Sequence, residues 1–165
     1  MYVRLLMLSL MLVGCKGTFM AEVQSGYQMS PAAGEISHGG TLAAHLGGSG
    51  VEGAGLGLSG RLRVWDHGWA APEIGPHGFV MYEDDGPIAF YTRANLYVGL
   101  MGAYGGIGPG FSAVLNPALV IYPGDSPEFL SIGLTGDITL SPVDQGYARG
   151  FIGLQVGFGV GGVGE

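Results

Sequence analysis

The sequence predicts an all-β protein, an up-and-down antiparallel β-barrel of about eight strands, and three observations support this prediction. Apolar residues alternate with small or polar residues along most of the 165-residue chain, and a period of two is that of a β-strand. Residues typical of turns separate the alternating segments at a spacing suited to a meandering sheet. No apolar run after the N-terminal segment reaches the about 20 residues that a membrane-spanning helix needs.

The composition predicts which solvent this barrel meets. Only 12% of the residues are charged and there is a single Lys, whereas ordinary soluble domains have about 25% charged residues. A soluble β-protein would need more charge than this to coat its exterior. Inside a membrane only helices and closed barrels satisfy every backbone polar group. We therefore expect a closed barrel whose apolar face meets lipid.

The first fifteen residues have the layout of a signal peptide, with Arg4 followed by a short apolar core at residues 5–13. They end in Leu12-Val13-Gly14-Cys15, which resembles the lipobox of bacterial lipoproteins. The resemblance implies cleavage after residues 1–14 and attachment of lipid, including palmitate, at Cys15. Because Lys16 follows, it also implies sorting to the outer membrane of a Gram-negative bacterium. The alternative is an ordinary secretory signal with an incidental cysteine.

The first half of the mature chain, taken in order, begins with alternating segments at residues 19–28 and 36–46, joined by a turn at 31–34. After a tight connection, residues 53–64 form the clearest strand, with one apolar face and one face of Gly, Ser and Arg. This strand contains Gly55-x-Gly57-x-x-Gly60, a dinucleotide-binding pattern. That motif needs a helix to follow, and here the strand period continues instead. We expect a longer loop at 65–76, then a short strand without clean alternation at 77–82.

The second half alternates more regularly. The Asp85-Gly86 pair predicts a hairpin turn before a strand at 88–100. A glycine-rich connection at 102–110 precedes a strand at 111–122, which Pro117 should disturb because proline cannot donate to a ladder. Turns at 122–127 and 141–146 then delimit strands at 130–140 and 148–160. No linker divides the mature chain, so residues 15–165 are expected to form a single β-barrel domain.

The charges test which face points inward. The Arg residues after the signal and three acids fall on the polar faces of the expected strands: Arg61, Arg63, Arg93, Arg149, Glu22, Glu35 and Asp137. The interior of a small barrel is just wide enough for side chains to fill. Charges buried there must pair, since an unpaired buried charge is strongly destabilising. We therefore predict that these seven residues form a lumen network that needs no cofactor or metal.

This pattern over residues 19–160 resembles that of small bacterial outer-membrane β-barrels. The resemblance implies a structural or surface-interaction role in the outer membrane, with membrane lipid as a partner and the outer loops as a surface for a protein partner. Barrels of that kind commonly end with an aromatic residue, whereas Phe158 is followed here by a short tail.

Because an even number of strands puts both termini at one end, a lipid on Cys15 would place that end at the periplasmic leaflet. The connection at 65–76 would then be outside and those at 47–50, 83–86 and 123–127 periplasmic.

Two other functions are compatible with the sequence. A lipid-tethered, soluble, lipocalin-like barrel would turn its Leu and Ile face inward around an apolar ligand. Such a barrel needs a charged exterior, and the shortage of Lys argues against it. A lipid-modifying barrel enzyme would need a His, Ser and acid set, but His38 and His45 are expected on opposite faces. Four residues could gather as metal ligands in one loop: Asp66, His67, Glu73 and His77. Their spacing fits no tight zinc pattern, so we expect a solvated polar loop instead. The net charge of −7 and the absence of a basic patch argue against nucleic acid.

Overall fold

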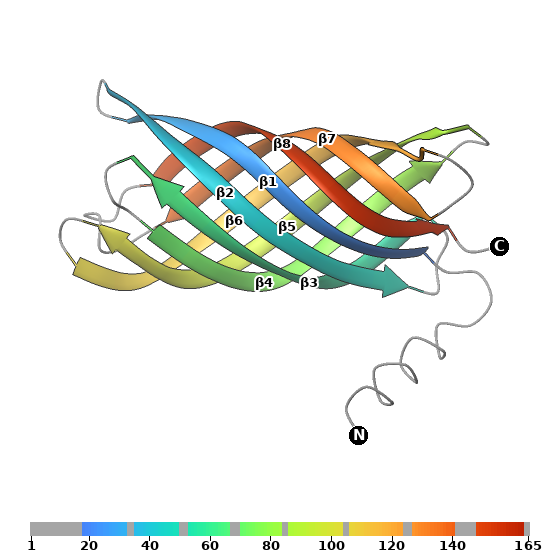
Figure 1. Cartoon of the computed structure of the whole chain (residues 1–165). Helices are drawn as coiled ribbons and strands as arrows, with labels where there is room; N and C mark the ends of the chain where they lie inside the picture. The colour runs from blue at the N-terminus through green and yellow to red at the C-terminus, as the bar shows by residue number, and fades with distance from the viewer. Residues whose placement is uncertain are drawn as a thin grey trace.

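The chain folds into one closed barrel of eight antiparallel strands, as the alternation predicted (Figure 1). The computed structural model describes residues 18–32, 35–49, 53–66, 70–83, 86–103, 106–123, 127–140 and 148–163. The expected signal peptide at 1–14 and the expected lipidation site at Cys15 lie outside these residues. The strands are β1 (Thr18–Ala32), β2 (Glu35–Ser49), β3 (Ala54–Trp65), β4 (Ala70–Glu83), β5 (Ile88–Ala103), β6 (Gly106–Ile121), β7 (Glu128–Leu140) and β8 (Ala148–Val163).

Each strand pairs with its neighbours in sequence, and β1 closes the barrel by pairing with β8. Thr18 is the register partner of Val163, so β1 begins where β8 ends (Figure 1). We call this the terminal end of the barrel and the opposite end the distal end. In the described part of the chain, no helix has the length and apolarity that a membrane crossing requires.

The two faces of the barrel wall have opposite polarity. Arg63 and Arg93 point into the lumen and are fully buried, whereas Leu56 and Leu154 point outward with 75% and 61% of their surface exposed. The same alternation runs through every strand. The lipocalin-like arrangement, with leucine and isoleucine around an inner ligand, is therefore wrong for this chain. The side-chain period of two commits each strand as a whole to one orientation.

The expected loop at 65–76 is wrong, because β3 continues to Trp65 and β4 already begins at Ala70. The two prolines that suggested a loop, Pro72 and Pro76, lie on the outer face of β4. The cost is local: the pairing of β4 with β5 skips Gly75 and Pro76 and then resumes in the same register. A proline removes one ladder donor without ending the strand.

The strands are also longer than expected at both barrel ends. The expected connection at 102–110 is wrong, since β5 extends to Ala103 and β6 begins at Gly106. Pro117 lies inside a continuous β6, and only the pairing with β7 skips Asn116 and Pro117. Only residues 66–69 lie between β3 and β4, where a connection over 65–76 was expected on the outer side.

Apolar side chains fill the lumen toward its two ends. At the terminal end a cluster comprises Met20, Phe79, Met81, Ala89, Tyr91, Ala118, Val120 and Phe129. At the distal end the rings of Trp65 and Phe151 lie 4.5 Å apart. Glycine makes room for the larger of these side chains: a Cβ at Gly39 would come within 2.7 Å of Cδ2 of Trp65. The polar part of the lumen lies between these apolar ends.

Candidate functional site

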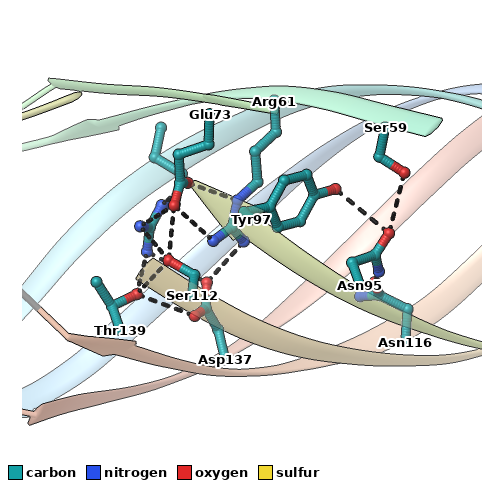
Figure 2. Close-up of polar contacts among 10 residues, drawn as sticks. Ser59, Arg61, Glu73, Asn95, Tyr97, Ser112, Asn116, Asp137 and Thr139 are labelled. Atoms are coloured by element: carbon teal, nitrogen blue, oxygen red, sulfur yellow. Dashed lines mark hydrogen bonds and ion pairs between the residues drawn. The ribbon is translucent and has the colours of Figure 1, made fainter. Parts of the chain in front are cut away.

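The most strongly charged part of the lumen lies toward the distal end and contains Arg61, Arg63, Glu73 and Asp137, which we call the four-charge cluster (Figure 2). Nε of Arg61 and Nε of Arg63 lie 2.6 and 2.8 Å from the same oxygen of Glu73. Nη1 of these two residues lies 2.7 and 3.2 Å from one oxygen of Asp137. Each carboxylate is thus shared by both guanidinium groups.

Two hydroxyl groups complete the hydrogen bonding of this cluster (Figure 2). The hydroxyl of Ser112 donates to Glu73 at 2.6 Å, and that of Thr139 donates to Asp137 at 3.0 Å. Arg63 in turn donates to the hydroxyl oxygens of Ser112 and Thr139 at 3.1 and 2.9 Å. Buried charges are tolerated when they are both paired and hydrogen-bonded, and this cluster satisfies both conditions.

A second ion pair lies toward the terminal end, where Nη1 of Arg93 is 2.8 Å from Glu22. Nη2 of Arg93 donates to the side-chain oxygen of Gln24 at 2.6 Å. The hydroxyl groups of Tyr91 and Ser131 donate to the Glu22 carboxylate, Tyr91 at 2.9 Å. We call Arg93 and Glu22 the two-charge cluster.

Between the clusters lies a neutral layer centred on Ser59, of which Figure 2 shows Ser59, Asn95 and Asn116. The Ser59 oxygen is 2.7 Å from Nδ1 of His45 and 2.6 Å from Nδ1 of His77. Its hydroxyl donates to the side-chain oxygen of Asn95 at 3.1 Å. Asn95 then donates to Asn116, and Asn116 donates to Gln155. Ser59 is only 2% exposed, and His45 and His77 are also buried.

Both clusters contain ion pairs that run across the lumen, whereas Glu73 on β4 pairs with Arg61 and Arg63 on the adjacent strand β3. In the closed order of eight strands, β3 and β7 are four positions apart and therefore opposite, as are β1 and β5. Arg61 on β3 reaches Asp137 on β7, and Arg93 on β5 reaches Glu22 on β1. Each pair is a brace between opposite walls. The lumen is accordingly filled by side chains, as the dimensions of an eight-stranded barrel dictate.

The buried charges balance. Among the side chains that the structure describes, those of Glu22, Glu73 and Asp137 are the buried carboxylates, and those of Arg61, Arg63 and Arg93 are the buried guanidinium groups. Three negative charges therefore face three positive charges, and every one of them lies in an ion pair. Because the six charges cancel, no uncompensated charge is left inside the barrel. An uncompensated buried charge would be strongly destabilising.

Of the seven residues predicted for the lumen, the structure brings five into these clusters: Glu22, Arg61, Arg63, Arg93 and Asp137. Arg149 is half-buried on β8, where its register partner on β7 is Thr139. Glu35 begins β2, but its side chain lies outside the described part.

The sequence analysis missed two lumen residues: Glu73 of the four-charge cluster and His77 of the neutral layer. Both were assigned to a solvated polar loop, and this assignment is wrong because both are buried on β4. Inward positions alternate from Ala71 to Phe79, so the period of two was present in the sequence but the prolines obscured it. Asp66 is exposed beside the distal end of β3, and His67 lies outside the described residues. Within the described residues no three His, Cys, Asp or Glu side chains are grouped so as to hold a metal ion.

No protein-family model and no curated protein matches the sequence, but solved structures match the fold. Neisserial surface protein A aligns with a TM-score of 0.64 at 10% identity, over 86% of this chain and 96% of that one. The N-terminal β-barrel domain of Pseudomonas aeruginosa OprF aligns with a TM-score of 0.53 at 18% identity, over 87% of this chain and 98% of that one. At these identities the likeness is one of fold, that of small eight-stranded outer-membrane barrels.

Proposed function

We propose that this chain is a structural or surface-interaction protein of a Gram-negative outer membrane, a barrel embedded in the bilayer with a closed lumen. One observation carries the proposal: the polarity of the barrel is inverted relative to a soluble protein. Among the strand side chains that the structure describes, only Glu128 presents a formal charge on the outer face, and it stands at the first position of β7. Lipid tails are the solvent that such a face fits.

The filled lumen supports a structural role over transport. The ion pairs join opposite walls, and their atoms occupy the space that an ion or solute would cross. The braces hold the wall at a fixed diameter without help from a ligand. We expect the purified protein to show no ion conductance in a planar bilayer.

A lipid on Cys15 would add a second attachment to the same membrane. Cys15 precedes β1 by three residues, so its lipid would enter the bilayer beside the terminal end of the barrel. The barrel alone should suffice for retention, because its outer face is apolar at most strand positions. The lipid and the barrel can therefore be tested separately.

The test is fractionation of Cys15→Ala carried by a signal peptide that does not require lipidation. We expect this variant to stay with the membrane through carbonate and urea washes and to migrate faster in unboiled than in boiled gel samples. The matched control is the Cys15→Ala protein with Leu154→Arg, which places a charge on the lipid face at a cost of about 2–4 kcal/mol near the midplane. Release of Cys15→Ala by carbonate, as a soluble folded protein, would overturn the proposal.

A further inference from the structure

The outer face of the barrel is apolar except at a few positions, and three of these lie together. Ser25 and Tyr27 on β1 and His38 on β2 point outward. Register pairing places Met29 opposite His38 and Gly40 opposite Tyr27, so the tyrosine and the histidine are diagonal neighbours on one face. Tyr82, another outward tyrosine, stands instead near the terminal end of β4, beside Phe90. The three polar residues therefore form one patch, toward the distal half of the wall.

Tyr27 and His38 are held in place. The Tyr27 hydroxyl is hydrogen-bonded to Nδ1 of His38, and the two rings stack with centroids 5.8 Å apart. The backbone of His38 is fixed in turn by Asp66, whose carboxylate accepts from the His38 N–H at 3.1 Å and whose own N–H donates to the His38 carbonyl at 3.0 Å. The pair is thus presented at a defined place near the distal end of β2.

The hydrogen-bonded pair still has a donor to offer. A neutral imidazole carries one N–H and a phenol one O–H, and only one of these two protons is used in the bond between Tyr27 and His38. The other proton is available in either tautomer. Ser25 adds a further hydroxyl, which has no hydrogen-bond partner among the described residues. Polar groups exposed to hydrocarbon are costly unless a partner satisfies them.

An apolar hollow adjoins this polar patch. It has a volume of about 390 Å³ and is lined on the outer face by Ser25, Tyr27, Ile132, Leu154 and Val156. Ser25 lies two residues nearer the middle of the wall than Tyr27, a separation of about 7 Å along the strand. The end of the hollow that lies toward the distal end of the barrel therefore offers donors, and the rest offers apolar walls with a single hydroxyl.

We propose that this patch binds one lipid with ester-linked acyl chains from the leaflet at the distal end. An acyl chain lies in the hollow against Leu154 and Val156. The Ser25 hydroxyl donates to an ester carbonyl of the lipid, and the free proton of the Tyr27–His38 pair donates to an oxygen of the head group. This site rests on the proposed membrane-embedded barrel, since a soluble protein would not present the patch to lipid.

The experiment compares lipid retained by the full mature chain after reconstitution in vesicles of palmitoyl-oleoyl phosphatidylglycerol, mild detergent extraction and native mass spectrometry. The triple variant Ser25→Ala with Tyr27→Phe and His38→Phe removes the Ser25 hydroxyl and both possible donors of the pair, and it should lose about tenfold in lipid-bound fraction, as expected for two hydrogen bonds. Tyr82→Phe removes an outward tyrosine hydroxyl elsewhere and should retain lipid like the unchanged protein. Equal retention by the triple variant and the unchanged protein would overturn the proposal, as would an equal loss in Tyr82→Phe.

A second arm tests the role of the ester. With the dialkyl-ether analogue of the same lipid, which lacks the carbonyls, the unchanged protein should retain less lipid, and Ser25→Ala alone should cause no further loss. Undiminished retention of the ether lipid would overturn the assignment of Ser25. Every sample is first checked for the faster migration of the folded barrel in an unboiled gel. A failure of insertion therefore appears there, before any lipid is counted.

Discussion

The four-charge and two-charge clusters brace the same lumen but distribute their charges differently. In the four-charge cluster, Glu73 and Asp137 each contact both Arg61 and Arg63. In the two-charge cluster, a single ion pair is surrounded by neutral donors and acceptors. The difference follows from the sequence: Arg61 and Arg63 are two residues apart on one strand and point to the same side. Two like charges so close need carboxylates from two different strands.

When two guanidinium groups share a carboxylate, both depend on it. Removing one carboxylate from the four-charge cluster affects both guanidinium groups, whereas Arg93 retains Gln24 when Glu22 is removed. We therefore expect the distal cluster to be the more sensitive of the two.

The largest effect is expected for Glu73→Ala. It leaves Asp137 as the only carboxylate shared by Arg61 and Arg63, and it also removes the acceptor of Ser112. The free energy of unfolding should fall by about 5 kcal/mol, the upper end of the range for breaking a buried pair. Urea unfolding in lipid vesicles measures this, with tryptophan fluorescence as the signal. The matched control is Glu128→Ala, an exposed acid on the outer face, which should cost less than about 1 kcal/mol.

Glu22→Ala should rank second, with a loss of about 3 kcal/mol, the lower end of the same range. Arg93 keeps one strong hydrogen bond, from its guanidinium group to the Gln24 oxygen at 2.6 Å. Glu22→Gln should recover part of the loss, because an amide oxygen can still accept from Tyr91 and Ser131. The same urea titration compares the three proteins. If Glu22→Ala proved as costly as Glu73→Ala, the idea that sharing sets the sensitivity would be wrong.

The barrel and the polarity of its faces could be predicted from the sequence because both depend on a local period. In a stretch such as residues 54–65, each residue's face follows from its neighbours two positions away. Prolines mislead this reasoning, because Pro72 and Pro76 indicate a loop in a segment that is a strand on the outer face. The misassigned loop removed Glu73 from consideration.

The pairing of charges could not be predicted in the same way. Glu73 faces Arg61 across a shared ladder, where the two are register partners. Asp137 reaches Arg61 only because closure puts β7 opposite β3. Such contacts depend on the number of strands and on their stagger around the whole barrel, and neither follows from one strand's pattern. A strand count that was wrong by two would have paired different residues.

The smallest effect is expected in the neutral layer between the clusters, where Ser59→Ala removes one hydroxyl. Nδ1 of His45 and of His77 both lose their partner, whereas the side-chain oxygen of Asn95 still accepts from the Tyr97 hydroxyl at 3.4 Å. No charged group loses its partner, so the free energy of unfolding should fall by about 1–2 kcal/mol, the cost of buried polar groups left unsatisfied. Tyr82→Phe is the matched control, since its hydroxyl faces outward, has no hydrogen-bond partner within the described protein and lies away from the lipid site; it should leave the free energy of unfolding unchanged. A loss in Ser59→Ala as large as that in Glu22→Ala would mean that strand packing around the serine, and not charge, sets the sensitivity of the lumen.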